Sequence, residues 1–289
     1  MTRQCAFLTL EDRTGFFIYD HLLFEPLAKI GWNASEIAWT RDDVDWSTYD
    51  AVVIRSTWDY QKTPEKFLET LEKIATVTNL YNPVNVCRWN LNKQYLRELS
   101  SRGVAIPPTR WLERLNEAEI ETTFEKFSTS KIVIKPLIGA NADHTFVLRS
   151  SDPTRFEVAL EHYQNRPLIA QPFLESITSE GEYSLFYFGG VFSHAICKRP
   201  KQNDFRVQEE HGGLISAAEP THELLVAGDR AINSVGEKLL YARVDLVRSN
   251  EGDWVLMELE LIEPSLYFEQ FEHAAKNFAR AFAQMFNGA

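Results

Sequence analysis

The sequence predicts a mixed α/β fold, with an open α/β unit followed by α+β units, and three observations lead to it. Strand-like and helix-like segments alternate over the first 90 residues, which is typical of a parallel sheet covered by helices. Hairpin patterns dominate the last third of the chain. The length of 289 residues exceeds that of a typical single domain, and a hydrophobic content of 44% supports a substantial core.

The first 90 residues read as a parallel α/β unit. Apolar runs predict its strands, amphipathic runs predict its helices, and Pro64 suits a first helical turn, where no backbone N–H is needed. The expected elements are strand 5–10, helix 19–32, strands 35–39 and 49–57, and helix 64–77. Ligands in such sheets bind beyond the carboxyl ends of the strands, which draws attention to the loop "RSTWDY" after the run "AVVI".

The rest of the chain reads as two smaller mixed units. A helix over 90–103 ends at Gly103, because glycine is a common helix stop. The further expected elements are strands 131–136, 145–150 and 167–174, helix 152–164, two strands around Gly189 and Gly190, helix 223–240, a hairpin over 241–261 and helix 269–286. We therefore expect an N-terminal substrate domain over residues 1–90, a central subdomain over 91–172 and a C-terminal subdomain over 173–289.

Charge and cysteine content restrict the classes of function. Asp and Glu number 41 against 30 Lys and Arg, which argues against a nucleic-acid or membrane partner, because those need clustered basic charge. Cys5, Cys87 and Cys197 lie far apart without metal-binding spacing, so we expect buried thiols. The sequence has neither a secretory signal pattern nor an apolar run of membrane-spanning length, which predicts a cytoplasmic protein with small polar partners.

The segment "WVLMELELIEPS" places two glutamates, Glu258 and Glu260, on one face of an otherwise apolar strand. The preceding strand, "YARVDLV", carries Arg243 and Asp245 on one face. A four-residue loop over 249–252 predicts pairs of Arg248 with Asp253, Asp245 with Leu256 and Arg243 with Glu258, with Met257, Leu259 and Leu261 on the opposite face. Because directly opposite residues share a face, the arginine and the three carboxylates are expected to project together.

Three clustered carboxylates repel one another unless cations neutralise them. Hard cations such as Mg²⁺ prefer oxygen ligands and are commonly held by one or two carboxylates together with substrate phosphates. The pattern therefore indicates a metal site at a nucleotide. A solvated, charged face of an ordinary hairpin is the alternative that this segment alone leaves open.

Cationic residues elsewhere fit phosphate or carboxylate recognition. Lys135 ends the strand "KIVIKP" beside the loop "LIGANADHT" and is placed to hold phosphate oxygens, although a solvated lysine is the default reading. Lys93 in "LNKQYL" carries no signal by itself. Arg206 lies between Phe205 and Val207 in a basic loop that ends in a glycine pair, which suits a clamp on a phosphoryl or carboxylate group.

The order of these segments resembles the ATP-grasp superfamily, especially its glutathione-synthetase-like and ribosomal-protein-glutamate-ligase-like branches. The resemblance rests on "NKQYLRELSSRGVAIPPT", "IVIKP", "LIAQPFLESITSEGEYSLFYF", "KRPKQNDFR…GG", "ARVDLV" and "MELELIEPS", from about residue 90 onward. The N-terminal "VVIRSTWDYQ" is similar to a narrower group, the cycloserine-pathway O-ureidoserine cyclo-ligases. An ATP-grasp fold, with ATP between the central and C-terminal subdomains, is what this resemblance implies.

The resemblance also implies roles for individual residues. It implies that Lys93 and Lys135 contact ATP and that Glu182 binds its ribose. The segment implied to lie beside the adenine is Gln171, Pro172, Phe173 and Leu174. Magnesium ligands, two ions in all, are implied at Asp245, Glu258 and Glu260, where Glu260 replaces an Asn that is common in relatives. Catalytic contacts are implied for Arg206, Arg243 and Lys198, and substrate contacts for Arg55, Ser56, Trp58, Asp59, Tyr60 and Ser265.

The implied reaction is ATP- and magnesium-dependent activation of a small-molecule carboxylate as an acyl phosphate, which an amine-type nitrogen then attacks. The substrate is expected to resemble an amino acid, with the nucleophile in the same molecule or in a second one. A binding module without turnover is the alternative, and a homo-oligomer is left open. For "RSTWDY" the alternative is that Trp58 and Tyr60 pack between domains while Arg55 and Asp59 pair with each other.

Overall fold

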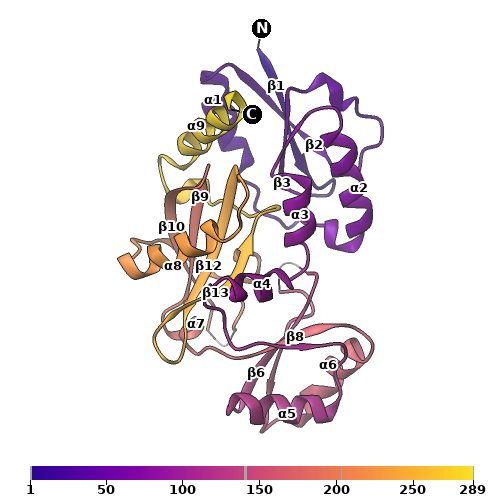
Figure 1. The fold of residues 1–289 in the computed structure, drawn as a ribbon, viewed down its shortest axis with the longest axis vertical. Helices are drawn as coiled ribbons and strands as arrows, with labels where there is room; N and C mark the ends of the chain where they lie inside the picture. The colour runs from indigo at the N-terminus through magenta and orange to yellow at the C-terminus, as the bar shows by residue number, and fades with distance from the viewer. Residues whose placement is uncertain (1, 140–141, 203, 289) are drawn as a thin grey trace.

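A computed structural model describes residues 2–139, 142–202 and 204–288. Its described strands form three sheets that follow one another along the long axis of the molecule (Figure 1), which confirms the predicted mixed α/β fold. The N-terminal sheet lies at the top of this view, the largest sheet in the middle and the smallest at the bottom. Among the described helices, none combines the length and the apolar character that a membrane crossing requires.

The N-terminal sheet is parallel, with the order β2-β1-β3-β4. Its strands are β1 (Arg3–Thr9), β2 (Trp32–Ala38), β3 (Ala51–Ser56) and β4 (Asn79–Tyr81), and its helices are α1 (Phe24–Lys29), α2 (Pro64–Ala75) and α3 (Val84–Asn90). Strands β1 and β3 are buried almost throughout, as expected for a parallel sheet with both faces covered.

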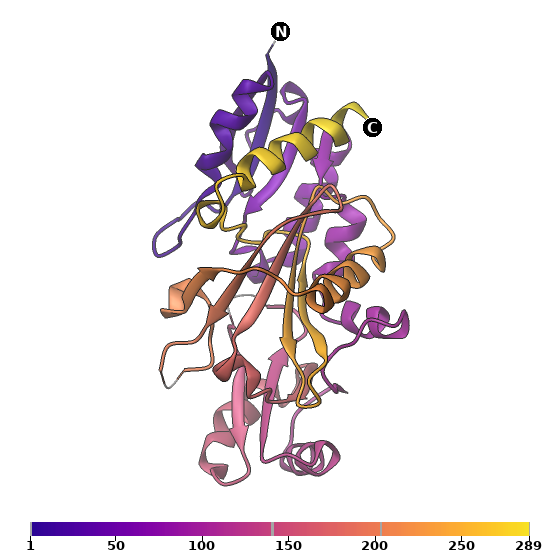
Figure 2. The same ribbon diagram turned by 90° about the vertical axis from the view of Figure 1, so that its left-hand side faces the viewer.

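The C-terminal helix α9 (Ala274–Asn287) returns to this sheet, so the two ends of the chain share one core. Figure 2 shows this helix beside the N-terminal strands. The rings of Trp32 and Phe282 meet edge to face with their centroids 4.7 Å apart. Such aromatic contacts add stability beyond the buried area, so α9 ties the N-terminal unit to the rest of the molecule.

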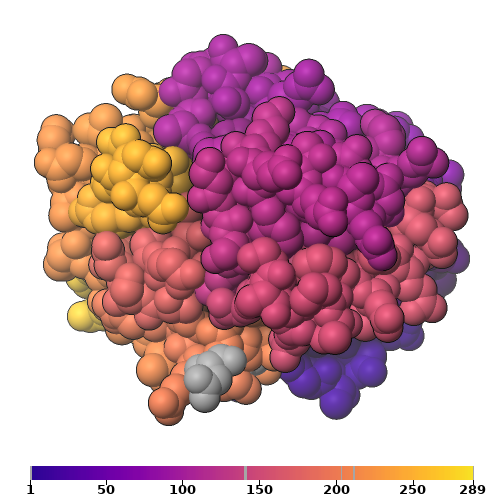
Figure 3. All heavy atoms as spheres, turned by 90° about the horizontal axis from the view of Figure 1, so that it is seen from below, coloured from indigo at the N-terminus to yellow at the C-terminus, as the bar shows by residue number. Residues whose placement is uncertain are grey.

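The smallest sheet is antiparallel, with the order β5-β8-β6-β7. Its strands are β5 (Arg110–Leu112), β6 (Lys131–Pro136), β7 (Phe146–Arg149) and β8 (Leu168–Pro172), and its helices are α5 (Glu117–Phe127) and α6 (Phe156–Tyr163). Both helices pack their apolar side chains on one face of the sheet. This unit forms most of the molecular surface in the view from below (Figure 3).

The largest sheet is antiparallel, with the order β11-β10-β9-β12-β13. Its strands are β9 (Glu182–Phe188), β10 (Val191–Arg199), β11 (Leu214–Ala217), β12 (Tyr241–Arg248) and β13 (Trp254–Glu260), and the associated helices are α4 (Tyr95–Ser101), α7 (Ser176–Ser179) and α8 (His222–Asn233). Helix α8 packs on one face of this sheet through the apolar sides of β12 and β13.

Short 3₁₀ helices are η1 (Asp20–Leu23), η2 (Trp46–Thr48), η3 (Tyr60–Lys62), η4 (Pro153–Arg155), η5 (Glu209–His211) and η6 (Phe268–Gln270).

Several predicted helices are shorter than expected. The helix expected over 90–103 begins only at Tyr95, because the Asn92 side chain accepts a hydrogen bond from the backbone N–H of Gln94 at 3.0 Å and forms a local turn. The helix expected over 223–240 ends at Asn233, and Gly236 follows in the left-handed region with φ at 78°. The helices expected over 19–32 and 269–286 are Phe24–Lys29 and Ala274–Asn287.

The predicted pairing of the two hairpin strands is wrong, but Arg243, Asp245, Glu258 and Glu260 do share one face, as predicted. The observed pairs are Arg248 with Trp254, Leu246 with Leu256, Asp245 with Glu258 and Arg243 with Glu260. The loop is one residue longer than predicted, which by itself would turn the glutamates to the other face. A β-bulge at Met257 adds a second residue to the same strand, so the two shifts return both glutamates to the face of Asp245.

Met257 itself does not join Leu259 and Leu261, as the regular alternation predicted. It packs instead with Ile177 and Val207 on the opposite side of the sheet from α8. A bulge places two successive side chains on one face of a strand, so Met257 and Glu258 both point away from the helix.

Strand β13 is the outer strand of its sheet, and side chains pair its free edge. The Asn90 amide donates to Leu259 O at 2.8 Å and accepts from Leu261 N–H at 2.9 Å. The Tyr95 hydroxyl accepts from Leu259 N–H at 3.0 Å, and Asn82 donates to Leu261 O at 2.8 Å. Buried backbone groups need such partners, so residues from α3, from α4 and from the turn before α3 take the place of a further strand.

The first prediction concerns this edge. We expect Asn90→Ala to destabilise the protein by about 2–4 kcal/mol, because two buried backbone groups of β13 lose their partners. Urea unfolding followed by circular dichroism measures the change. Asn85→Ala on the same helix is the matched control, since Asn85 is exposed and bonds only to the exposed Glu237 among described side chains. Equal stability of the two variants would show that the edge contacts contribute nothing.

Candidate active site

One cavity lies between the smallest and the largest sheet, where it is lined by residues from both. Strand β6 contributes Lys135, strands β9 and β10 contribute Glu182 and Lys198, and strands β12 and β13 contribute the hairpin carboxylates. The apolar side chains that line it include Val133, Phe173, Ile177 and Met257. The cavity therefore combines an apolar surface with a dense set of charges.

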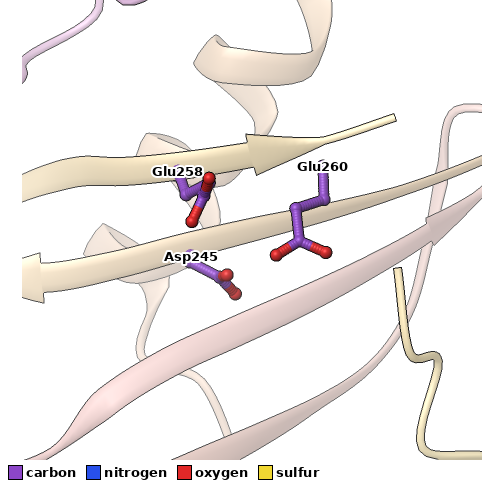
Figure 4. Close-up of side chains that lie close together, drawn as sticks. All are labelled: Asp245, Glu258 and Glu260. Carbon is purple, nitrogen blue, oxygen red and sulfur yellow. The ribbon is translucent and has the colours of Figure 1, made fainter. Parts of the chain in front are cut away.

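The three hairpin carboxylates meet inside this cavity, as Figure 4 shows. Asp245 extends from β12, and Glu258 and Glu260 extend from the adjacent strand β13. Each offers one oxygen, and these oxygens all lie within 4.8 Å of one another. An all-oxygen set at this spacing matches the ligands that Mg²⁺ prefers, so the residues present fit such an ion.

Three cations of the chain neutralise this cluster. Arg243 bonds to both Asp245, at 3.0 Å, and Glu260. Lys198 lies 2.5 Å from Glu182 and 3.3 Å from Asp245. Lys93 reaches Glu258 from the opposite side at 2.8 Å. Each carboxylate of the cluster thus has a cationic partner within the protein.

The pKa values reflect both burial and these partners. Burial opposes ionisation of Asp245, but Arg243 and Lys198 outweigh it and keep the pKa of its carboxyl below the usual value. The pKa of Glu258 is lowered in the same way by Lys93, against the effect of burial. For Glu260 burial dominates and raises the pKa to about 7, despite Arg243. Glu260 is thus the member of the cluster that gives up a proton least readily.

Lys93 and Lys135 face the carboxylates from the other wall of the cavity. Lys93 also donates to Gly139 O at 3.2 Å, within the loop "LIGANADHT". Burial lowers the pKa of Lys135, while Glu258 acts in the opposite direction. Ala140 and Asn141 of this loop lie outside the described residues, whereas Ala142, Asp143 and Thr145 line the cavity.

The segment predicted to border the adenine is largely buried. Phe173 lines the cavity, and the Lys131 ammonium lies over its ring at 3.2 Å from the centroid. Gln171, Pro172 and Leu174 are buried behind this surface, where Gln171 donates to the Thr109 hydroxyl at 3.0 Å. Of the four predicted residues, Phe173 is the one whose side chain lines the cavity.

Arg206 lines the cavity but is engaged within its own loop. Its guanidinium forms two hydrogen bonds with the Asp204 carboxylate, at 2.8 and 3.1 Å. The same pair holds the pKa of Asp204 well below its usual value. Because the arginine side chain is 38% exposed, it can exchange this partner for another anion without desolvation of a buried charge.

The loop "RSTWDY" differs from its prediction in two places. Arg55 and Ser56 do not line the cavity, because both are about 1% exposed. Arg55 forms a buried ion pair with Asp20 at 2.9 Å, and Ser56 bonds to the Thr9 hydroxyl at 2.8 Å. Since the carboxylate partner of Arg55 is Asp20, the alternative pairing with Asp59 is also wrong.

The remaining residues predicted for the substrate lie at the cavity or beside it. Trp58, Tyr60 and Ser265 line it together with the carboxylates. Asp59 accepts a hydrogen bond from the Trp39 indole at 2.6 Å and lines a second, adjoining cavity. Trp58 and Arg206 line both cavities, so the two adjoin at these side chains.

Glu263, Tyr267 and Phe205 also line the cavity and were missed from the sequence. Glu263 follows Glu260 by three residues and precedes Pro264, so the strand alternation that identified the other two glutamates no longer applies. The one feature of the sequence that marks Glu263 is that it is a third acidic residue after an otherwise apolar strand.

The cavity carries more negative than positive charge. Its lining has seven carboxylates against five cations, a formal balance of −2. The carboxylates are Asp143, Glu182, Glu210, Asp245, Glu258, Glu260 and Glu263, and the cations are Lys93, Lys135, Lys198, Arg206 and Arg243. A polyphosphate needs additional positive charge to bind here, which agrees with the fit of a divalent cation to the carboxylates.

Comparison with known proteins gives two family matches along the chain. Residues 5–82 match the N-terminal domain of D-cycloserine synthetase DcsG, and residues 103–249 match the ATP-grasp domain of prokaryotic glutathione synthetase. The cycloserine biosynthesis protein DcsG of Streptomyces lavendulae is 32% identical over 281 residues, which cover 91% of this chain and 92% of that protein.

Solved structures agree with these matches. The crystal structure of D-cycloserine synthetase DcsG aligns with a TM-score of 0.85 at 29% identity, over 98% of this chain and 99% of that one. The ATP-grasp ligase PsnB, in a complex with a minimal precursor, Mg and ADP, aligns with a TM-score of 0.67 at 17% identity, over 99% and 98% of the chains. The macrocyclase MdnC from Microcystis aeruginosa MRC aligns with a TM-score of 0.67 at 13% identity, over 99% and 100%. The last two show a shared fold.

The second prediction tests the carboxylate cluster. We expect Glu258→Gln to weaken divalent-cation binding at least about tenfold, because one of three anionic ligands is lost. Titration with Mn²⁺ followed by electron paramagnetic resonance measures free ion. Glu258 is a better position to change than Asp245. Asp245 is 2% exposed and lies between Lys198 and Arg243, so its loss would leave both cations without a full partner.

Glu251→Gln in the hairpin turn is the matched control, because Glu251 is exposed and lies on the same hairpin. An ion affinity of Glu258→Gln equal to that of this control would contradict the metal assignment.

Proposed function

The chain belongs to the ATP-grasp ligases, in the family of cycloserine biosynthesis protein DcsG, and we propose that it joins a carboxylate to an amine-type nitrogen of a small amino-acid derivative. ATP-dependent ligation is the activity of this family. The alternative of a silent binding module receives no support from these relatives. The magnesium ions, the substrate and the residue roles described below are parts of the proposal.

The observation that carries the proposal is the meeting of three carboxylates with two lysines in one cavity. Asp245, Glu258 and Glu260 would hold Mg²⁺, for which we propose two ions. When bound there, magnesium supplies positive charge to the phosphate oxygens of ATP. Lys93 and Lys135 would contact the same phosphates, which requires Lys93 to exchange its bond with Glu258 for one with a phosphate oxygen.

The apolar part of the cavity suits the adenine. Val133, Ile177 and Met257 offer flat contact for a base, and the segment 171–174 offers backbone hydrogen-bonding groups. Glu182 lines the same cavity and would bond to the ribose hydroxyls. Burial raises the pKa of Glu182, and Lys198 at 2.5 Å opposes this effect and favours the ionised acceptor that a hydroxyl needs.

The reaction consists of two transfers. An oxygen of the substrate carboxylate first attacks the γ-phosphorus of ATP, the bond to the β-phosphate oxygen breaks, and an acyl phosphate and ADP form. The nitrogen then attacks the acyl carbon, the bond to the phosphate oxygen breaks, and inorganic phosphate leaves as the nitrogen loses a proton. The chain positions the groups and stabilises charge, because phosphoryl transfer needs little covalent assistance.

Three cations of the chain would stabilise this charge. Arg206 can leave Asp204 for the transferring phosphoryl group, because the arginine side chain is 38% exposed and lines the cavity. Arg243 and Lys198 stay fixed by the carboxylates and would direct their remaining hydrogen-bond capacity at the acyl phosphate. Trp58, Tyr60 and Ser265 would surround the substrate body, and Asp59 would act from the adjoining cavity.

The substrate is tested by ADP release. Purified protein is incubated with Mg²⁺, ATP and single compounds: D- and L-O-ureidoserine, serine, 2,3-diaminopropionate and dipeptides. We expect ADP release with a compound that contains both a carboxylate and a nitrogen within ring-closing reach, and mass spectrometry then distinguishes a ring from a linear amide. Absence of ADP release with every compound would contradict the proposed substrate class.

The third prediction separates binding from catalysis. We expect Lys135→Ala to raise the Kd for ATP about tenfold or more, because a ground-state phosphate contact is lost, whereas Arg206→Ala should lower kcat by about 10²-fold with little change in Kd. Calorimetric ATP titration and saturated turnover rates provide the two numbers. Lys201→Ala, an exposed lysine in the loop of Arg206, is the control. Equal losses of affinity and rate in both variants would contradict separate roles.

A further inference from the structure

The segment that leaves strand β13 is held by an unusual set of hydrogen bonds. Each of four successive carbonyl oxygens, those of residues 262–265, accepts a hydrogen bond from a side chain. The donors are Trp58 to Glu263 O at 2.8 Å, Arg55 to Pro264 O at 3.0 Å and Arg243 to Ser265 O at 3.3 Å. Ile262 O lies 2.8 Å from the Tyr241 hydroxyl, which shares its one proton between this oxygen and Ile54 O at 2.6 Å. The backbone of this segment is therefore fixed from four directions.

Two of these donors belong to the loop "RSTWDY", which gives that loop a role other than the one predicted for Arg55. Arg55 is itself fixed by its buried ion pair with Asp20, so it cannot move without loss of a buried partner. The N-terminal unit thereby sets the position of residues 262–265. The two side chains that this segment presents to the cavity are Glu263 and Ser265.

Glu263 differs in its surroundings from the other carboxylates next to it. Asp245, Glu258, Glu260 and Glu182 each have a lysine or arginine partner, whereas Glu263 forms no ion pair with the residues that the structure describes. Burial raises its pKa to about 8, with a further contribution from Glu260 and an opposing one from the Tyr60 hydroxyl. A carboxyl group without a cation at a cavity wall is suited to a cationic or proton-bearing ligand group.

From this geometry, and on the basis of the proposed function, we infer that Glu263 binds the substrate nitrogen and takes its proton when the nitrogen attacks the acyl phosphate. Trp58, through the Glu263 carbonyl, and Arg55, through the next carbonyl, are the positioning residues for this carboxylate. Tyr60, beside the carboxylate in the same wall, limits the space in which the nitrogen can lie.

The proposed step is balanced in atoms and charge. The nitrogen lone pair forms the bond to the acyl carbon, and the bond between that carbon and the phosphate oxygen breaks. One proton moves from the nitrogen to the Glu263 carboxylate, and phosphate leaves with its electron pair. The carboxyl group then returns the proton to phosphate or to water.

The distinguishing experiment follows the two half-reactions separately in Glu263→Gln. The variant is incubated with Mg²⁺, ATP and O-ureidoserine, or the compound that is active in the panel, with and without hydroxylamine. Hydroxylamine is uncharged at neutral pH and needs no carboxylate to receive it, so it traps the acyl phosphate as a hydroxamate. We expect amide formation to fall by about 10²-fold or more, while hydroxamate formation stays within about threefold of that of the wild-type protein.

Glu269→Gln is the matched control, because Glu269 is exposed and follows on the same segment. Thermal melting confirms that each variant folds. Loss of both products in Glu263→Gln would place the carboxylate in the phosphorylation step or at the metal and would overturn the inference, as would retention of both.

Trp58→Phe gives a second test, because it removes the indole donor to the Glu263 carbonyl while an aromatic ring stays in the wall. We expect the ratio of amide to hydroxamate to fall below that of the wild-type protein, by a smaller factor than in Glu263→Gln. An unchanged ratio would contradict the positioning role. Failure of the wild-type protein to release ADP with every compound would contradict the proposed substrate class, whereas wild-type turnover with an unaffected Glu263→Gln would contradict this inference alone.

Discussion

The site depends on the pairing of one free strand edge. Strand β13 carries Glu258 and Glu260 and is the outer strand of its sheet, so without further partners its edge would be exposed and its position loosely defined. Asn90 and Asn82 supply side-chain amides in place of a neighbouring backbone, at 2.8–2.9 Å. Asn90 lies three residues before Lys93, so the segment that pairs with β13 also carries the lysine that bonds to Glu258 on that strand.

The second constraint is electrostatic. The carboxylates of Asp245, Glu258 and Glu260 are buried enough to be costly unless paired, and Arg243, Lys198 and Lys93 provide that pairing. In the proposed function these pairs differ in what they do when ligands bind. Lys93 lies at the boundary and can exchange a carboxylate for a phosphate, whereas Arg243 is held by two carboxylates and a backbone carbonyl. The cations that neutralise the carboxylates in the free protein can therefore also contact the ligand. Ligand binding then requires little further desolvation of charged groups.

The loop "RSTWDY" shows how a set of polar residues can be assigned to the wrong neighbour. Its composition suggests direct contact with an amino acid, but Arg55 is directed at Asp20 and at the backbone of Pro264. The functional effect of such a residue passes through the segment it holds, which presents Glu263 and Ser265 to the cavity. In a site between two units, residues of one unit thus position the reactive side chains of the other.

The sequence by itself determined the α/β class and the parallel N-terminal sheet from local periodicity, and the order of its motifs placed Asp245, Glu258 and Glu260 in one site. It could not determine the register of the hairpin, in which an extra loop residue and the bulge at Met257 cancel each other, since both depend on contacts with neighbouring strands. The partner of Arg55, 35 residues away, and the isolation of Glu263 were decided only by the tertiary structure. Burial and charge pairing between distant segments have no local pattern, so they become visible only when the chain is folded.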